Sequence, residues 1–243
     1  MRNGEDWVIR LFAAYLMVGM SCLGCSRHET AGFSSDPKLA QAQQSIAEGD
    51  YDAAVSQAKE IASQIPPSSA TSQALYLEAY CMVYGWGDFH QAARALRGLL
   101  QADPKGPLAL PAQKLLADCD YWQGNYSRAI REYGPLVTAG EKDPREDASL
   151  QIANCLLLKN KVGDAITAYR AIVDKAPASA SSDMAQMMIA NIYLKIQNPT
   201  QAKTEFEKLI SFTRNKAFQE DARNCVRQID AQEPFQKSSG KPE

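Results

Sequence analysis

Histidine is the side chain most often used for acid–base catalysis and metal binding near neutral pH. The chain has two, His28 and His90, which lie far apart in the sequence. Neither has other ligand-type residues at the spacing of a metal or catalytic cluster, and we expect both to be exposed to solvent. The histidines therefore predict no catalytic residue, no metal site and no cofactor.

Cysteine offers a second route to chemistry. Cys22 and Cys25 have the spacing of a metal-binding pair, but they lie in an apolar N-terminal segment. Cys119 and Cys155 are expected at equivalent positions of neighbouring helices, about 8–10 Å apart, whereas a disulfide needs Cα atoms within roughly 7 Å. We expect the remaining cysteines to be buried free thiols. These are Cys81, Cys119, Cys155 and Cys225.

Carboxylates gather at one point of the chain, where Glu141, Asp143, Glu146 and Asp147 precede an expected helix. Negative charge is favourable at the start of a helix, and no apolar residues nearby would raise the pKa of a catalytic acid. No glycine-rich loop of the phosphate-binding type follows a strand. The sequence therefore predicts that the protein is not an enzyme.

Composition agrees with a folded helical protein. The 243 residues are 45% hydrophobic and carry a formal net charge of −2, which excludes a wholly disordered chain. A nucleic-acid partner is not expected, because such a partner usually requires a large basic excess. No segment alternates β-branched and polar residues as a strand does. The predicted class is all-α.

The N-terminal segment is expected to be removed from the mature protein. Leu11–Leu23 is apolar and follows Arg2 and Arg10; it is too short to span a bilayer, which needs about 20 residues, but has the length of a signal-peptide core. The sequence Leu23-Gly24-Cys25-Ser26 resembles a bacterial lipobox. This resemblance implies a signal peptide over 1–24, lipidation of Cys25 and a lipidated tether over 25–36. Cys22 is the alternative acylation site. A plain signal peptide cleaved near Gly24 and an uncleaved N-terminal anchor are further alternatives.

The residue after the lipidated cysteine directs sorting in lipoproteins of some bacteria with two membranes. Ser26 resembles the signal for the outer membrane. The implied location is the periplasmic face of the outer membrane, with the folded part held near the bilayer by the tether, which spans roughly 35–40 Å when extended. The N-terminal lipid is then the protein's membrane contact.

The rest of the chain is an internal repeat. Similar seven-residue segments begin at Glu48, Trp86 and Gln123, with two weaker copies further on. Alanines close these five segments at intervals of 38, 37, 36 and 37 residues. A period of this length is typical of helical repeat arrays, in which each hairpin buries its apolar face against the next. The alanines are Ala54, Ala92, Ala129, Ala165 and Ala202.

Each repeated segment has the residues of a turn between two helices. Gly49, Gly87 and Gly124 are expected in the left-handed conformation that ends a helix, and an Asp or Asn follows each of them as the cap of the next helix. In the fourth segment the glycine moves to Gly163. A proline twelve residues after the alanine ends the second helix in three repeats. These prolines are Pro66, Pro104 and Pro177.

Further caps mark the borders of the repeat domain, which we expect over 37–230. Asp36-Pro37, Asp143-Pro144 and Asn198-Pro199 are predicted to combine a cap with a first-turn proline. Apolar residues follow one face of a last helix over 216–230, which predicts a cap that seals the array. Residues 231–243 have the composition of a disordered tail.

The five segments together resemble tetratricopeptide repeats. The resemblance implies a right-handed superhelix, or α-solenoid, of five helix hairpins plus a C-terminal cap helix. It also implies that the first helix of each hairpin lines a concave groove that binds a protein or peptide partner. Residues in the matching groove positions are Leu77, Tyr84, Lys114, Asp118, Tyr121, Leu150, Asn154, Met187 and Asn191.

The long period, the lipobox and the short tether resemble the small repeat lipoprotein of the outer-membrane β-barrel assembly machinery. This resemblance implies a lipid-anchored periplasmic scaffold in envelope assembly, with an outer-membrane barrel-assembly subunit as a partner. Two alternatives in the same class are a cell-division coordinator of the Tol-Pal type and a pilus or secretion assembly lipoprotein. An enzyme built on a helical superhelix is the alternative from another class, but it would need a separate catalytic domain.

Overall fold

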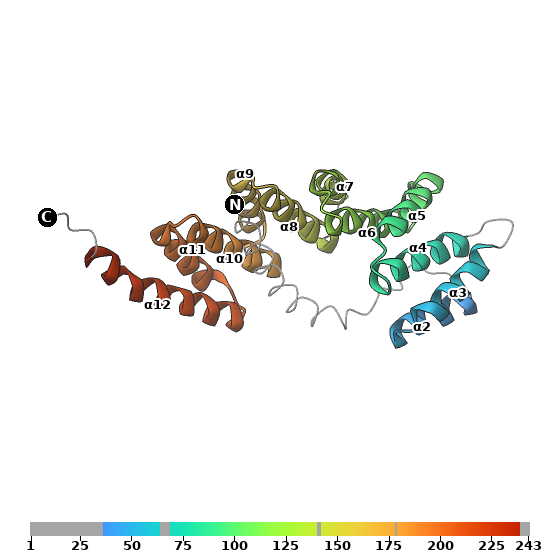
Figure 1. Ribbon diagram of the computed structural model, residues 1–243, viewed down its shortest axis with the longest axis horizontal. Coiled ribbons are helices and arrows are strands. Elements are labelled where there is room, and N and C mark those ends of the chain that lie inside the picture. Colours follow the sequence, from blue (N-terminus) through green and yellow to red (C-terminus); the bar gives the residue numbers. More distant parts are fainter. Residues whose placement is uncertain (1–35, 64–68, 140–141, 178, 239–243) are drawn as a thin grey trace. The chain divides into compact units, whose positions relative to one another are not determined.

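The computed structural model describes residues 36–63, 69–139, 142–177 and 179–238. Every regular element in these ranges is an α-helix, and the helices form five hairpins followed by α12 (Figure 1). The predicted all-α hairpin array with a C-terminal cap helix is confirmed. In chain order the helices are α2 (Pro37–Glu48), α3 (Tyr51–Ala62), α4 (Ser69–Tyr84), α5 (Phe89–Ala102), α6 (Ala109–Trp122), α7 (Tyr126–Thr138), α8 (Lys142–Leu158), α9 (Val162–Lys175), α10 (Ala180–Lys195), α11 (Pro199–Phe212) and α12 (Lys216–Ser238).

The hairpins belong to two compact units. The first unit ends at Ala109 and holds α2 to α5; the second begins at Leu110 and holds the remaining hairpins and α12. The sequence predicts one continuous repeat domain over 37–230, because the repeat phase runs through this border without a break. The predicted signal peptide, and the tether up to residue 35, lie outside the described residues.

The turns inside the hairpins repeat one backbone geometry. Gly49, Gly87 and Gly124 have φ angles of 81°, 66° and 75°, so the predicted left-handed conformation is confirmed. In the first turn Gly49 N donates to Ile46 O at 3.0 Å and Asp50 N donates to Ser45 O at 2.8 Å. This pair of hydrogen bonds satisfies the last carbonyl groups of the helix. Glycine takes this conformation without the cost that a Cβ atom adds.

The last two turns keep this geometry without glycine. Asn160 and Gln197 are left-handed, with φ angles of 58° and 59°, and Lys161 N donates to Leu156 O at 2.9 Å just as the earlier turns do. Gly163, to which the sequence assigns the fourth turn, lies inside α9 instead. The left-handed residue therefore recurs at intervals of 38, 37, 36 and 37 residues, as the alanines do.

Side-chain caps hold the start of several second helices. Asp50 accepts a hydrogen bond from Ala53 N at 2.9 Å, and Asp88 accepts one from Gln91 N at 3.0 Å. Asn198 caps α11 in the same way, through Gln201 N at 3.1 Å. Asn125 departs from the prediction, because its side chain makes no cap hydrogen bond and donates instead to Gln123 Oε1 at 3.3 Å.

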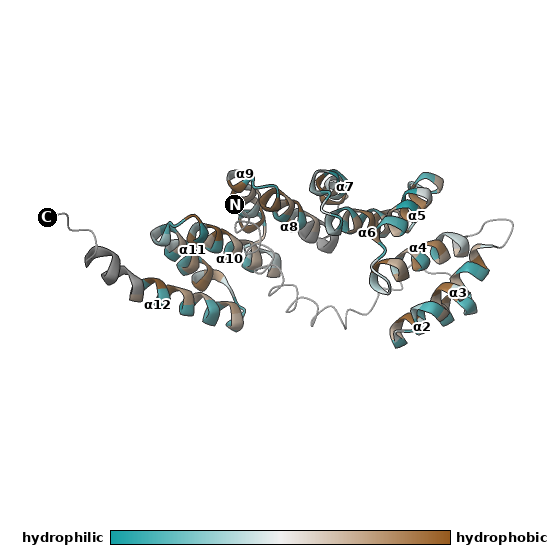
Figure 2. Cartoon of the chain, in the orientation of Figure 1, coloured by the Kyte–Doolittle hydropathy of each residue, from teal (hydrophilic) through white to brown (hydrophobic). Residues whose placement is uncertain are grey.

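Small residues allow the two helices of each hairpin to pack closely. The five repeated alanines are all 0% exposed, which confirms their predicted role. In the first unit, Leu39, Ile61 and Leu77 pack in one cluster; in the second, Tyr133, Leu136 and Cys155 pack in another. Figure 2 shows apolar and hydrophilic residues interleaved along the helices, as helices with one buried face require.

Two helix borders differ from the prediction. Helix α8 starts at Lys142, so Asp143 is the second residue of the helix and not its cap. Pro144 is still tolerated, because the first four backbone N–H groups of a helix have no partner within the helix. Helix α12 extends to Ser238, so the tail boundary predicted at residue 231 is too early. Residues 231–233 are Ala, Gln and Glu, which favour helix.

Other predicted ends agree with the structure. Helix α2 begins at Pro37 with Asp36 as its cap, through Lys38 N at 2.9 Å. Pro104 and Pro177 follow the ends of α5 and α9, whereas Pro66 lies outside the described residues. Among the residues that the structure describes, no helix is both long enough and apolar enough to cross a membrane.

The cysteines of the repeats are free thiols. Cys81, Cys119 and Cys155 are buried, in agreement with the prediction, whereas Cys225 on α12 is only half-buried. Helix α12 covers the last hairpin with one face alone, so its side chains meet fewer neighbours than those of a helix packed on two sides. The opposite face of α12 is solvated, with Glu220, Arg223 and Asn224 exposed.

Candidate functional site

In the second unit the first helices of three successive hairpins present the same three positions, which we call the first-helix row. The positions are four and three residues apart, so they follow one face of each helix. Equivalent members are 36 or 37 residues apart, in phase with the repeat. The row consists of Lys114, Asp118 and Tyr121 on α6, Leu150, Asn154 and Leu157 on α8, and Met187, Asn191 and Leu194 on α10.

The middle position of the row is polar on all three helices. On α6 the hydroxyl of Tyr133 donates to Asp118 Oδ1, and on α8 the hydroxyl of Tyr169 donates to Asn154 Oδ1 at 2.6 Å. Both tyrosines are buried on the second helix of the hairpin, fifteen residues after their acceptor. These two hydrogen bonds stabilise the fold, so the acceptor atoms of Asp118 and Asn154 are already occupied within the hairpins.

The third hairpin of the unit lacks this hydrogen bond. Phe206 occupies the position of the two tyrosines on α11 and is 0% exposed. Because phenylalanine has no hydroxyl, Asn191 receives no hydrogen bond of the kind that Asn154 receives. Asn191 is also half-buried, whereas Asn154 is 7% exposed. Asn191 is therefore the member of the middle row that keeps amide surface for a partner.

Several residues predicted for the groove lie in the core instead. Leu77, Leu150 and Met187 are 5%, 6% and 2% exposed, so a partner could reach them only if neighbouring side chains moved. Asn154 is buried with them, and its amide donates to Gln151 Oε1 at 3.2 Å. The sequence could not separate core from groove here, because both sets repeat with the same period.

The other predicted residues keep some solvent contact. Lys114, Asp118 and Tyr121 are half-buried, and Lys114 Nζ donates to Asp118 Oδ2 at 3.0 Å. The Tyr121 ring packs edge-on against Trp122, with centroids 5.3 Å apart. Burial raises the pKa of Tyr121, and the nearby Cys155 adds to the effect, so this phenol stays protonated and can donate a hydrogen bond at any physiological pH.

Large apolar side chains are exposed mainly where the first helices end. Tyr84 is 52% exposed, as its groove assignment requires, and Trp122 is 46% exposed. Three others, Trp86, Ile196 and Leu194, are 48%, 50% and 37% exposed. Trp86 and Ile196 were not predicted as surface residues. Their exposure could have been predicted from their position, because both lie within one or two residues of a turn, where neighbouring helices no longer cover the helix face.

A buried carboxylate cluster was also missed. Glu205 on α11 is 1% exposed, and its oxygens accept hydrogen bonds from Gln186 Nε2 at 2.8 Å and Gln201 Nε2 at 2.9 Å. Arg170 and Lys208 lie 3.1 and 3.2 Å from Glu205 Oε1. Burial raises the pKa of Glu205, but the hydrogen bonds from Gln186, Gln201 and Lys208 outweigh it, so the pKa lies below its usual value.

This carboxylate is structural rather than reactive. All of the groups that contact Glu205 stabilise its charged form, whereas a general acid needs a carboxyl whose protonated form is favoured. Gln113 contacts Glu132 in the same way two hairpins earlier, with its amide 2.7 Å from Glu132 Oε2 and 3.1 Å from the Glu132 carbonyl. Each Gln–Glu pair is nineteen residues apart, a repeated spacing that the sequence did contain.

The thiols are not activated. Burial raises the pKa of Cys81 to about 11 and that of Cys155 to about 12. A thiol with such a pKa is protonated at neutral pH, and only the thiolate is a good nucleophile or metal ligand. Among the described residues, no three His, Cys, Asp or Glu side chains lie together as metal ligands would, and His90 is exposed. The side chains of Asp143, Glu146 and Asp147 lie outside the described residues, as does Glu141.

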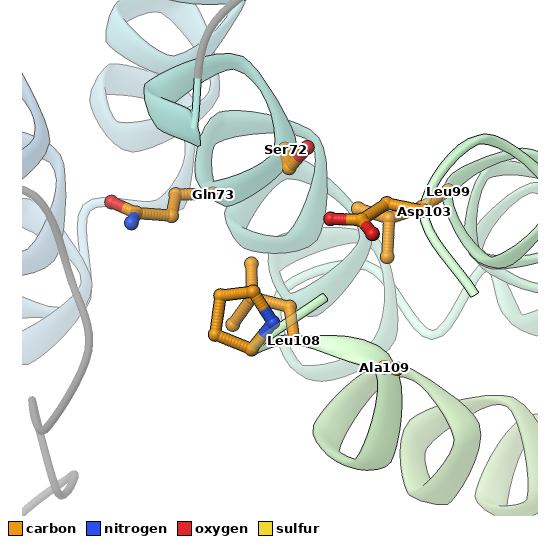
Figure 3. A pocket seen from close by; sticks show the side chains of 7 residues that line it. Ser72, Gln73, Leu99, Asp103, Leu108 and Ala109 are labelled. Atoms are coloured by element: carbon orange, nitrogen blue, oxygen red, sulfur yellow. The ribbon is translucent and has the colours of Figure 1, made fainter. Parts of the chain in front are cut away.

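The cavity of the first unit is too small for a ligand. It is lined by Ser72, Gln73, Leu99, Asp103, Pro107, Leu108 and Ala109, which Figure 3 shows around it. Its volume of about 30 Å³ accommodates water, whereas ligand pockets usually measure about 300–1,000 Å³. The second unit has an open hollow of about 290 Å³ beside the turn between α6 and α7, lined by residues 124–128 and Lys159.

Comparison with protein families identifies the repeat. Three models of the tetratricopeptide repeat match the chain, over residues 86–146, 120–180 and 184–211. Together they cover four of the five hairpins in whole or in part. The chain belongs to the tetratricopeptide-repeat proteins, and the family expected from the sequence is confirmed. Among curated protein sequences, none matches the chain significantly.

Solved structures agree on the fold. MamA from Desulfovibrio magneticus RS-1 superposes with a TM-score of 0.59 at 16% identity, covering 74% of this chain and 97% of MamA. YrrB, described as a tetratricopeptide-repeat protein with an unusual peptide-binding site, superposes with a TM-score of 0.56 at 15% identity, covering 79% of this chain and 92% of YrrB. At such low identity these similarities show the fold alone. Membership of the tetratricopeptide-repeat family indicates a protein–protein interaction scaffold, a class that is generally non-enzymatic.

Proposed function

We propose that this protein is a non-enzymatic periplasmic adaptor in outer-membrane protein assembly, anchored by a lipid on Cys25 to the periplasmic face of the outer membrane. In this proposal its first helices bind an extended or helical segment of a protein partner, and an outer-membrane barrel-assembly subunit is the leading candidate. The observation that carries the binding role is the half-buried amide of Asn191, which the fold leaves without the tyrosine hydroxyl that Asn154 receives.

The chemistry of the row favours a peptide backbone as its ligand. An asparagine side chain has one carbonyl acceptor and two amide donors, so it can pair with both groups of a peptide unit. Tyr121, the last row position on α6, supplies the broad amphipathic surface that is common at interface hot spots. A mixed amide and apolar row suits an internal segment of a partner better than a C-terminal carboxylate, which needs basic side chains.

The proposed anchor depends on the sequence around Cys25. Acylation of this cysteine and of its new α-amino group would supply several acyl chains, and more than one chain is needed for stable membrane binding. The first described residue after it is Asp36, which caps α2, and a segment of this length, even fully extended, keeps the repeats near the bilayer.

Metabolic labelling tests the anchor. Cells that express the full chain are given radiolabelled palmitate, and the protein is isolated with and without Cys25→Ala. We expect label in the parent chain and none in the variant. Equal label in both proteins would overturn the assignment to Cys25, and a matched Cys22→Ala variant distinguishes the alternative acylation site.

Affinity capture from solubilised membranes tests the partner. The parent chain is compared with Asn191→Ala and with Gln228→Ala, a control at an exposed position on α12. We expect a barrel-assembly subunit to co-purify with the parent and the control, and its recovery to fall at least tenfold with Asn191→Ala. Absence of any barrel-assembly subunit from the parent sample would overturn the proposed pathway, and equal recovery with all three proteins would overturn the role of Asn191.

A further inference from the structure

The hairpin turns of the second unit combine exposed apolar and basic side chains. Trp122, Leu194 and Ile196 are 46%, 37% and 50% exposed, and each lies at or next to the end of a first helix. Lys159, Lys161 and Lys195 are exposed at the ends or turns of the same helices. We call these six residues the basic turn edge.

These turns are neighbours in space. The first helices α8 and α10 contact each other, and the repeat phase makes them present their C-terminal ends on the same side. The turn between α8 and α9 also contacts the start of α7, because Lys159 Nζ donates to Ser127 Oγ at 2.6 Å. The three turns of the second unit therefore form one continuous edge.

Acidic residues offset only part of the charge on this edge. Lys161 lies 3.6 Å from Asp164, and Arg128, which lies beside the edge, is 3.3 Å from the buried Asp120. The Lys159 ammonium is held by the neutral hydroxyl of Ser127. By formal charge, the turn segments 121–128, 157–164 and 194–201 each carry +1, although the whole chain has a net charge of −2.

The equivalent turns of the first unit have the opposite charge. Residues 48–53 contain Glu48, Asp50 and Asp52, and residues 84–91 contain Asp88, while neither segment contains lysine or arginine. Trp86 in the second of these turns is 48% exposed, about as much as Trp122. Two equally exposed tryptophans thus lie in equivalent turns with opposite surrounding charge.

We propose that the basic turn edge of the second unit binds the surface of an anionic phospholipid bilayer. Lysines near such a surface are attracted to its headgroups, and tryptophan and aliphatic side chains enter the boundary between headgroups and acyl chains. The apolar side chains lie at successive turns rather than in an enclosed pocket, and a bilayer binds such points without a matching groove. The acidic turns around Trp86 are repelled by the same surface.

The experiment uses the full chain, with Cys25→Ala to remove the proposed lipid, so it does not depend on the proposed anchor. The three tryptophans are Trp7, Trp86 and Trp122. One protein carries Trp7→Phe and Trp86→Phe, which leaves Trp122 as the only tryptophan. Its matched control carries Trp7→Phe and Trp122→Phe, which leaves Trp86. Each is mixed with vesicles of phosphatidylglycerol and phosphatidylcholine whose acyl chains are brominated, and tryptophan quenching is measured.

We expect quenching of Trp122 by the anionic vesicles, no quenching by vesicles of phosphatidylcholine alone, and no quenching of Trp86. Neutralising one lysine is expected to weaken binding about fivefold. The combined Lys159→Gln, Lys161→Gln and Lys195→Gln variant should therefore need on the order of 100-fold more lipid for half-maximal quenching. Binding in 1 M salt should be largely lost, because the Debye length falls to about 3 Å.

Three results would overturn the proposal. The first is unquenched Trp122 at all lipid concentrations. The second is equal quenching of Trp86 and Trp122, which would show insertion through the shared N-terminal segment. The third is quenching that the lysine substitutions leave unchanged. If polyglutamate peptide shifts the Trp122 emission while anionic vesicles do not, the edge binds acidic protein segments and the bilayer assignment is wrong.

Discussion

The hairpins α8/α9 and α10/α11 have the same backbone arrangement but differ in the hydrogen bonds that their polar side chains make. In the first, Tyr169 on α9 closes the polar row by donating to Asn154. In the second, Phe206 takes the tyrosine position, and a buried carboxylate, Glu205, lies one residue earlier in the chain. Two neighbouring repeats thus bury polar side chains at different positions.

This difference shows that the repeat phase determines the backbone geometry, but not whether the side chain at a given position is buried and hydrogen-bonded or exposed to solvent. The tyrosine hydrogen bond makes Asn154 part of the core, whereas its absence leaves the Asn191 amide half-buried on the same face. A single hydroxyl therefore decides whether an asparagine in this row stabilises the fold or remains accessible to a partner. Substitutions in the two hairpins and their turns test that contrast.

Removing the Glu205 carboxylate should have the largest effect. Glu205→Ala leaves a cavity in the core and leaves the buried Gln186 amide without its carboxylate acceptor, which together should cost roughly 2–5 kcal/mol. Urea unfolding followed by circular dichroism measures the change in unfolding free energy. The matched control is Glu132→Ala, whose side chain is 21% exposed and whose loss should cost about 1 kcal/mol. Equal costs would contradict the assigned role.

Exchanging Tyr169 and Phe206 should exchange the hydrogen-bonding of the row asparagines between the two hairpins. Tyr169→Phe leaves Asn154 Oδ1 buried without its donor, which should lower the unfolding free energy by about 1–3 kcal/mol.

The reverse change, Phe206→Tyr, supplies a hydroxyl fifteen residues after Asn191. We expect a gain of about 1 kcal/mol together with weaker capture of the protein partner, measured in the affinity experiment with Asn191→Ala as reference. Partner recovery that is unchanged in Phe206→Tyr would show that the asparagine amide does not contact the ligand.

Acid should remove the stabilisation that the charged Glu205 carboxylate gives to the α10/α11 hairpin. The pKa of Glu205 lies below its usual 4.5 in the folded protein, so its contribution to stability is fully present above pH 4.5 and is lost as the pH falls through the folded-state pKa. The effect is smaller than that of Glu205→Ala, because a protonated carboxyl keeps its shape and one acceptor oxygen. Unfolding free energies are measured from about pH 3 to 6, roughly the range over which a carboxylate of this kind is protonated. The values for the parent and Glu205→Gln should converge at the acid end of this range.

The smallest changes concern the turns. Gln197 holds the left-handed conformation at φ 59°, which costs a residue with a Cβ atom about 1–2 kcal/mol. Gln197→Gly should therefore stabilise the protein by roughly 0.5–1 kcal/mol, as measured by thermal unfolding. Gly124→Ala should cost about 1 kcal/mol, and for conformational reasons alone, because a Cβ atom there would have no neighbour within 4 Å. No change in melting temperature for either variant would contradict this account.

Much of the fold could be predicted from local patterns. The five alanines, the glycines of the first three turns and the Asp50 and Asp88 caps indicated the hairpins and their borders, and the structure confirms them. The candidate site was predicted less well. Tyr84 and Tyr121 retain solvent contact, but Leu77, Leu150 and Met187 are core residues, because the periodicity that marks a helix face does not say how deeply it is covered.

The sequence by itself determined the helix borders and the repeat phase, since caps and left-handed turns depend on a residue and its near neighbours along the chain. Tertiary structure alone decided that Asn160 and Gln197 adopt the left-handed conformation that glycine has in the earlier turns. It also decided that Tyr169 donates to the Asn154 carbonyl and that Glu205 is buried. The physical reason is that burial and hydrogen-bond partners depend on residues distant in the chain, which can hold a residue in a conformation that its own local preference disfavours.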